Sequence, residues 1–130
     1  MHEPVWIREI EAFALHKRLL SQFGGSEGLR DSAMLDSALS RPKNRFAYSE
    51  QPPTLGELAA AYAYGICKNH PFVDGNKRTA MAVAMLFSEY NGAEVTATQE
   101  AAYLTFLGLA EGSISEEELT IWFAENSAPK

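Results

Sequence analysis

The chain has 130 residues, 46% hydrophobic and 22% charged, which is the composition of an ordinary globular protein. The net charge of −6 argues against a nucleic-acid backbone as the main partner, because phosphate contacts need clustered Lys and Arg. The length favours a single domain, 1–130, the charge suits a cytoplasmic protein, and no apolar run approaches the roughly 20 residues that span a bilayer.

Helical spacing of apolar residues predicts a first amphipathic helix from Pro4 to about Phe23, ended by two glycines. His16 lies within it beside two cations, and we expect a surface or half-buried side chain without a catalytic part. Asp31 is the expected N-cap of a second, short helix, which Pro42 closes.

The segment 41–53 shows no helical period and is long for a connection in a compact domain. We expect a loop here with at most one short β-hairpin. It is either a plain surface loop, in which Phe46 and Tyr48 anchor the chain, or a flap that contacts a substrate.

Four further helices follow from capping residues and apolar spacing. Thr54 and Glu57 form a capping box for a third helix, and the stretch 77–90 is apolar almost all round, as expected for a central helix. Thr96 or Thr98 begins a fifth helix, and Ser115 begins the last. The sequence therefore predicts an all-α bundle of about six helices around 77–90.

The third and fourth helices are joined by the most distinctive stretch of the chain, Asn-His-Pro-Phe-Val-Asp-Gly-Asn-Lys-Arg-Thr at 69–79. Pro71 should push His70 into an extended backbone and end the preceding helix. Lys77 and Arg78 then fall in the first turn of the next helix, where the helix dipole disfavours cations. A bound polyanion would compensate for them, and the N–H groups of a helix N-terminus attract anions.

These residue types suit transfer of a phosphate-containing group from a nucleotide. His70 can act as base, because histidine side chains ordinarily change charge near neutral pH. Asp74 is suited to hold Mg²⁺, and the N–H groups near Gly75 and Asn76 can bind a phosphate. Lys77 and Arg78 would neutralise the charge that grows as the bond breaks. One histidine and one aspartate are too few ligands for zinc.

The run His70-Pro-Phe-Val-Asp-Gly-Asn-Lys-Arg78 resembles the signature of the Fic/Doc (Fido) superfamily, and stretches at 24–31, 37–42 and 58–62 are similar to its death-on-curing (Doc) branch. The resemblance implies a compact α-helical toxin that acts on translation from the cytosol. It also implies that His70 is the base, Phe72 fixes the loop in the core and Asp74 holds magnesium. Gly75, Asn76, Lys77 and Arg78 would then bind the phosphates.

Lys77 stands where AMP-transferring members of the family have a second glycine. The resemblance therefore implies reversed ATP, which presents its γ-phosphate to a threonine of elongation factor Tu. Two alternatives remain open: AMP transfer to a protein hydroxyl, and a silent module that only binds a nucleotide or partner. No internal inhibitory motif of the Ser/Thr-x-x-x-Glu-Gly/Asn type occurs, so the implied restraint is a Phd-like antitoxin whose disordered tail folds into a groove.

Overall fold

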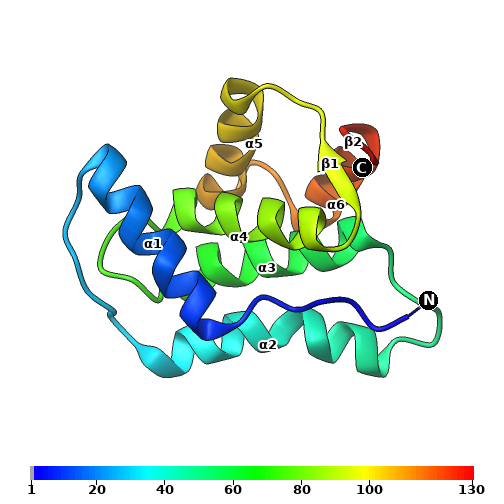
Figure 1. Ribbon diagram of the computed structural model, residues 1–130, viewed down its shortest axis with the longest axis horizontal. Coiled ribbons are helices and arrows are strands. Elements are labelled where there is room, and N and C mark those ends of the chain that lie inside the picture. Colours follow the sequence, from blue (N-terminus) through cyan, green and yellow to red (C-terminus); the bar gives the residue numbers. More distant parts are fainter. Residues whose placement is uncertain (1) are drawn as a thin grey trace.

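A computed structural model describes residues 2–130 and contains eight elements in that range (Figure 1). They are α1 (Glu9–Phe23), α2 (Ser32–Tyr48), α3 (Leu55–Asn69), α4 (Asn76–Tyr90), β1 (Ala93–Val95), α5 (Gln99–Glu111), α6 (Glu116–Glu125) and β2 (Ser127–Pro129). The expected helical bundle of about six helices is confirmed.

Local capping determines most of the helix starts. The Asp31 carboxylate accepts hydrogen bonds from the N–H groups of Ala33 and Met34 at 3.0 and 3.2 Å. Thr54 and Ser115 each form a reciprocal capping box with the glutamate three residues later. Thr98, and not Thr96, caps α5. These starts are predictable because their donors and acceptors lie within one turn of chain.

The core is centred on α3 and α4, which lie side by side with α2 along one side and α5 and α6 on the other (Figure 1). Tyr62 of α3 and Phe87 of α4 are fully buried and contact each other across this pair. Gly65 allows α2 to approach α3, because a Cβ placed there would lie 3.2 Å from the Cα of Ala38. The α3–α4 pair therefore shares the central position that the sequence predicts for 77–90 alone.

The predicted end of the first helix at Phe23 is confirmed, but its predicted start at Pro4 is wrong, because residues 4–8 belong to no helix or strand and α1 begins at Glu9. Trp6 of this segment stacks on Phe87 with ring centroids 5.8 Å apart. Ile7 is buried and donates its N–H to the Tyr62 hydroxyl oxygen at 2.9 Å. These long-range contacts hold the segment outside the helix, so tertiary structure overrides the local spacing.

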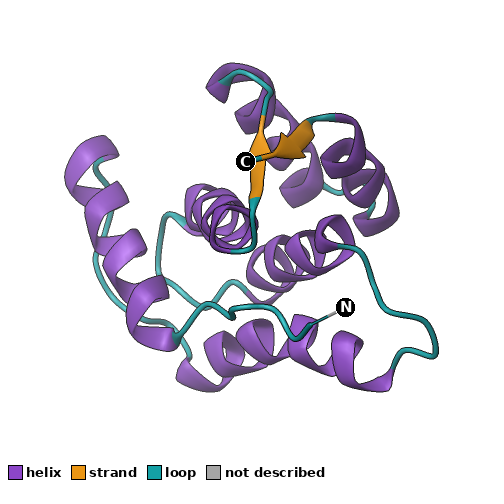
Figure 2. Cartoon of the chain, turned by 45° about the vertical axis from the view of Figure 1, so that its right-hand side comes forward, coloured by secondary structure: helices purple, strands orange, loops and turns teal. Residues whose placement is uncertain are grey.

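The predicted loop at 41–53 is also largely wrong, because α2 runs past Pro42 to Tyr48. Phe46 packs edge-on against Trp6, and this contact helps to hold the last turns of α2 despite the missing N–H of Pro42. Tyr48 is 85% exposed and does not anchor the chain. Within residues 2–130 the one strand pair joins β1 to β2, antiparallel (Figure 2), and no hairpin forms at 41–53.

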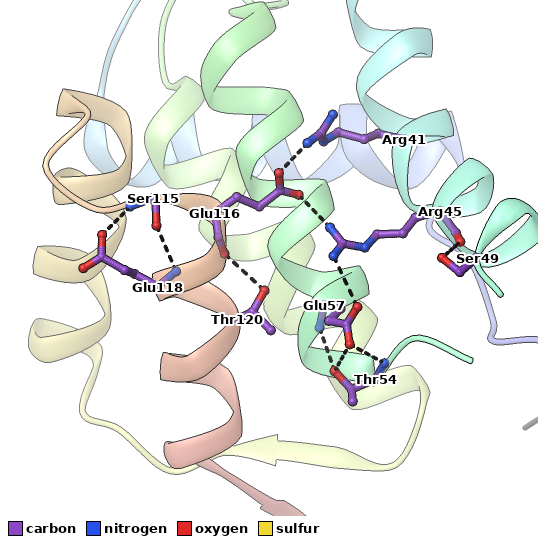
Figure 3. Close-up of polar contacts among 9 residues, drawn as sticks. All are labelled: Arg41, Arg45, Ser49, Thr54, Glu57, Ser115, Glu116, Glu118 and Thr120. Atoms are coloured by element: carbon purple, nitrogen blue, oxygen red, sulfur yellow. Dashed lines mark hydrogen bonds and ion pairs between the residues drawn. The ribbon is translucent and has the colours of Figure 1, made fainter. Parts of the chain in front are cut away.

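A charged network ties α6 to α2 and α3 (Figure 3). The buried Glu116 carboxylate accepts hydrogen bonds from Arg41 and Arg45, and Arg45 also donates to Glu57 at 3.2 Å. The acidic first turn of α6 is therefore more than a capping device. No helix within residues 2–130 is long and apolar enough to cross a membrane.

Candidate active site

His70 ends α3 in a left-handed conformation, with φ 51° and ψ 55°, and it is the one non-glycine residue within 2–130 at positive φ. The sequence predicts an extended backbone, which is wrong, although Pro71 does exclude the right-handed helical region. The Arg30 side chain holds this turn, because its guanidinium donates to the carbonyl oxygens of His70 and Asn69 at 2.6 and 2.7 Å. The imidazole is exposed.

The loop after His70 is paired with the segment that precedes α2. The N–H groups of Arg30 and Asp31 both donate to the Pro71 carbonyl, and Val73 N–H donates to the Gly28 carbonyl at 3.0 Å. Connections far apart in sequence therefore meet at one end of the bundle, at the left of the view in Figure 1.

Asn76 shapes the loop from within. Its Oδ1 accepts the N–H of Phe72 at 3.0 Å and its Nδ2 donates to the Phe72 carbonyl at 2.9 Å, so the orientation of this amide is fixed. The other hydrogen of Nδ2 faces Nδ1 of His70 at 3.1 Å. In this arrangement Nδ1 is the acceptor, and the neutral ring carries its hydrogen on Nε2. The Phe72 ring is fully buried.

The Asp74 carboxylate is exposed, but backbone donors orient it. Ser26 N–H donates to Oδ2 at 3.1 Å and Gly75 N–H donates to Oδ1 at 2.9 Å. The Ser26 bond, followed by the Gly75 bond, lowers the pKa of the Asp74 carboxyl below its usual value. A Cβ on Gly25 would lie 2.9 Å from Oδ2, so Gly25 permits the close approach of these two segments.

Asp74 is the one carboxylate that lines this cleft, and residues 2–130 contain no group of three His, Cys, Asp or Glu side chains that could hold an ion. Each carboxylate oxygen has a second lone pair for a ligand. One carboxylate fits an Mg²⁺ ion that also binds substrate phosphates and waters, and it does not fit a cage made of protein ligands.

The N-terminus of α4 opens into a cleft of about 430 Å³, whose lining includes His70, Asp74 and Lys77. No side chain of the described residues caps this helix, and the N–H groups of Asn76, Lys77 and Arg78 have no hydrogen-bond partner there. These donors are available to an anion.

Arg78 is held at the cleft between two aromatic rings. Its guanidinium carbon lies 4.0 Å from the centre of the Phe23 ring and 4.6 Å from that of Tyr103. Stacking on ring faces leaves the N–H groups at the edge of the guanidinium free to donate. Lys77 is exposed beside it. Two cationic side chains, which could bind an anion, thus line the same cleft as the free N–H groups.

His16 contradicts the expectation of a surface or half-buried side chain, because it is only 6% exposed and contacts the loop. Its ring stacks on Phe72, with centroids 3.9 Å apart and planes 10° apart, and its Nε2 lies 2.8 Å from the Asp74 carbonyl oxygen. No pattern in the sequence predicts this contact, since helical spacing cannot show which distant segment covers a face.

Arg30, Phe23 and Tyr103 also belong to the site and are not predicted as such. Arg30 lies in the Gly28-Leu-Arg-Asp31 stretch that carries the family resemblance, so family comparison could have selected it. Phe23 and Tyr103 come from the end of α1 and from α5, and no local pattern connects them with the loop.

Comparison with known proteins shows the family of the chain. The model of the Fic/DOC family matches residues 6–88, which is more than half of the chain and includes the whole loop. The chain belongs to the Fic/DOC family. A protein of Escherichia phage P1 named "Protein kinase doc" is 39% identical over 105 residues, covering 81% of this chain and 82% of that protein. A protein of Mycolicibacterium smegmatis named "Toxin Doc" is 41% identical over 75 residues, covering 58% of each chain.

The loop thus lies in the part shared with other Fic/DOC family members, as do Arg30 and His16. Tyr103 lies outside the segment matched by the family model. The aromatic clamp on Arg78 therefore combines one ring from the Fic/DOC segment with one from the helix that follows it.

Proposed function

We propose that this protein is a Doc-like toxin that transfers the γ-phosphate of ATP to a threonine hydroxyl of elongation factor Tu and so blocks translation. The family, and the similarity to proteins named as a kinase and a toxin, support the class of activity. The observation that carries the proposal is that an exposed histidine shares one cleft with an uncapped helix N-terminus and two cations.

The residues divide the work as follows. The first N–H groups of α4, with Lys77 and Arg78, bind the phosphates and stabilise their developing charge. His70 takes the proton from the threonine hydroxyl, the oxygen forms a bond to the γ-phosphorus, and the bond between that phosphorus and the β–γ bridging oxygen breaks to release ADP.

For Nε2 of His70 to take this proton, the ring hydrogen must first move from Nε2 to Nδ1, and Nδ1 must turn away from the hydrogen of Asn76 that it now faces. Substrate binding would supply this change.

Mg²⁺ would be held by Asp74 together with phosphate oxygens and would neutralise part of the phosphate charge. The Ser26 and Gly75 N–H groups keep the carboxylate oriented and ionised for this purpose.

We further propose that the toxin acts in the cytoplasm, where elongation factor Tu is found, and that a Phd-like antitoxin restrains it. The similarity to Doc proteins supports this partner.

The decisive experiment incubates the protein and elongation factor Tu with ATP labelled at either the α- or the γ-phosphate. Label transferred only from the γ position supports the kinase. Transfer from the α position would establish AMP transfer instead, and nucleotide binding without any transfer would leave a silent module.

Two variants test the assigned residues. His70→Ala should reduce transfer by about 10²- to 10⁴-fold, the usual contribution of a positioned base, without unfolding the protein. A folded His70→Ala variant with full activity would contradict the base.

Lys77→Gly should weaken γ-phosphate transfer. Lys77→Ala is its control, because glycine alone costs a helix about 1 kcal/mol. Unchanged γ-transfer in both variants would remove Lys77 from the mechanism.

A further inference from the structure

His16 makes the only side-chain hydrogen bond to the Asp74 carbonyl oxygen within residues 2–130, at 2.8 Å from Nε2. A carbonyl oxygen only accepts, so Nε2 is the donor and carries a hydrogen. The imidazole is buried and stacked on Phe72, which leaves it little freedom to turn away. This bond therefore attaches α1 to the loop 70–75 between α3 and α4, the motif loop.

The anchored carbonyl belongs to the peptide between Asp74 and Gly75. Glycine takes positive and negative φ almost equally well, so this peptide can rotate at little cost unless another group holds it. Gly75 here has φ 79°, the left-handed conformation that begins α4. His16 also lies against Gly75, since a Cβ there would be 3.7 Å from Nε2.

Rotation of this peptide would turn the Gly75 N–H away from Asp74 Oδ1, which it now contacts at 2.9 Å. Oδ1 and Oδ2 belong to one carboxylate, so its second bond, from the Ser26 N–H, depends on the same alignment. The anchor on the backbone thus determines where the carboxylate points.

We propose that His16 is a positioning residue for the phosphate-transfer site: its Nε2–H locks the Asp74–Gly75 peptide, and with it the carboxylate that receives Mg²⁺·ATP and the start of α4. The effect of His16 on phosphate transfer rests on the proposed function. His16 itself touches neither substrate nor metal.

A matched pair of variants isolates the hydrogen bond. Gln and Met have the same length and neither has a ring, but only the Gln amide places an N–H where Nε2 of His16 lies. His16→Met should raise the Mg²⁺ concentration for half-maximal γ-phosphate transfer about 10- to 100-fold, the usual effect of losing a group that orients a metal ligand. His16→Gln should restore most of this loss.

A second measurement needs no activity. Hydrogen exchange of the Ser26 and Gly75 amides, which donate to Asp74, should become faster in His16→Met than in His16→Gln. Thermal unfolding of the two variants identifies any general loss of stability, and exchange of the α3 amides serves as the internal reference.

The outcomes separate the two proposals. If the wild-type protein transfers no phosphate but the Ser26 and Gly75 amides respond as expected, the proposed function fails and the positioning role stands. If Met and Gln at position 16 give equal exchange at these amides, the positioning role is overturned, whatever the activity. If only His16→Met unfolds, exchange of the Ser26 and Gly75 amides is compared between His16→Gln and the wild type. Similar exchange supports the positioning role, and faster exchange in His16→Gln overturns it.

Discussion

At the scale of single residues, the groups at the cleft are held by neighbours from other elements. Asp74 is oriented by Ser26, Arg78 by two rings, and the His70 turn by Arg30. The motif supplies the chemical groups, and α1, α5 and the 24–31 segment fix their directions. Preorganisation of this kind lowers the reorganisation needed at the moment of reaction.

Asp74→Asn should lower γ-phosphate transfer by about 10- to 100-fold. The amide can accept from only one of the Ser26 and Gly75 N–H groups, and its own NH₂ then faces the other donor. The rate as a function of Mg²⁺ concentration measures the effect. An unchanged Mg²⁺ requirement would contradict the role given to this carboxylate.

The same substitution tests the lowered pKa of Asp74. A carboxyl whose folded pKa lies below its unfolded value of 3.8 stabilises the fold above that value, and the contribution is lost as pH falls through the folded pKa. The stability difference between the wild type and Asp74→Asn should therefore be larger at pH 7 than at pH 2. Urea unfolding at the two pH values provides the comparison, and a constant difference would speak against the shift.

Gly25→Ala should disturb Asp74 without altering the motif itself. The new Cβ would lie 2.9 Å from Asp74 Oδ2, at a backbone φ of 126° that side chains disfavour. We expect reduced γ-phosphate transfer with secondary structure retained, measured beside Gly24→Ala, whose Cβ meets no atom within 4 Å. Both positions have positive φ, so equal losses would attribute the effect to backbone strain alone.

At the scale of elements, the features that the sequence predicts correctly depend on contacts within one helical turn, and the others depend on contacts between distant segments. The caps at Asp31, Thr54 and Ser115 are local, and they were predicted correctly. By contrast, α2 continues beyond Pro42 and the segment 4–8 is not helical, and these two parts of the chain meet through the rings of Phe46 and Trp6. The short strands β1 and β2 have three residues each and no room for alternation, so their pairing could not be read from the sequence.

The residues of the candidate site also differ in whether the sequence predicts them. The residues of the motif loop are identified by their chemistry and spacing, and the structure places His70, Asp74 and Lys77 at one cleft. Arg30 and His16 act on backbone carbonyls, which every residue has, so no side-chain pattern reveals their targets.

Glu116→Gln should destabilise the protein by about 1–2 kcal/mol. A broken buried pair costs more than this, but Arg41 and Arg45 retain about 40% side-chain exposure, so solvent screens the loss. Glu117→Gln is the matched control, since its side chain is exposed one position along α6. Chemical denaturation of both variants gives the difference, and equal stabilities would mean that the network contributes nothing.

At the scale of the whole molecule, burial in the α3–α4 core links global stability to alkaline pH. Burial raises the pKa of the Cys67 thiol from 9.0 to about 11 and that of the Tyr62 hydroxyl to about 12. Both groups must stay protonated in the folded state. The fold therefore loses stability as pH rises above the unfolded values of these groups.

Between pH 9 and 10 the thiol should dominate this loss, because the phenol of Tyr62 ionises later even in the unfolded chain. We expect the free energy of unfolding to fall by up to about 1.4 kcal/mol per pH unit in this interval. Cys67→Ala should flatten the slope, as measured by urea titrations at several pH values. A slope that persists in the variant would assign the loss to other groups.

The left-handed turn at His70 has a consequence for how the chain responds to selection. Glycine adopts this backbone more readily than histidine does, so a search for heat-resistant variants without a test of toxicity would favour glycine there. Such a library would accumulate more stable molecules that lack the imidazole proposed as the base. At position 70, stability of the fold and the proposed activity thus favour different residues.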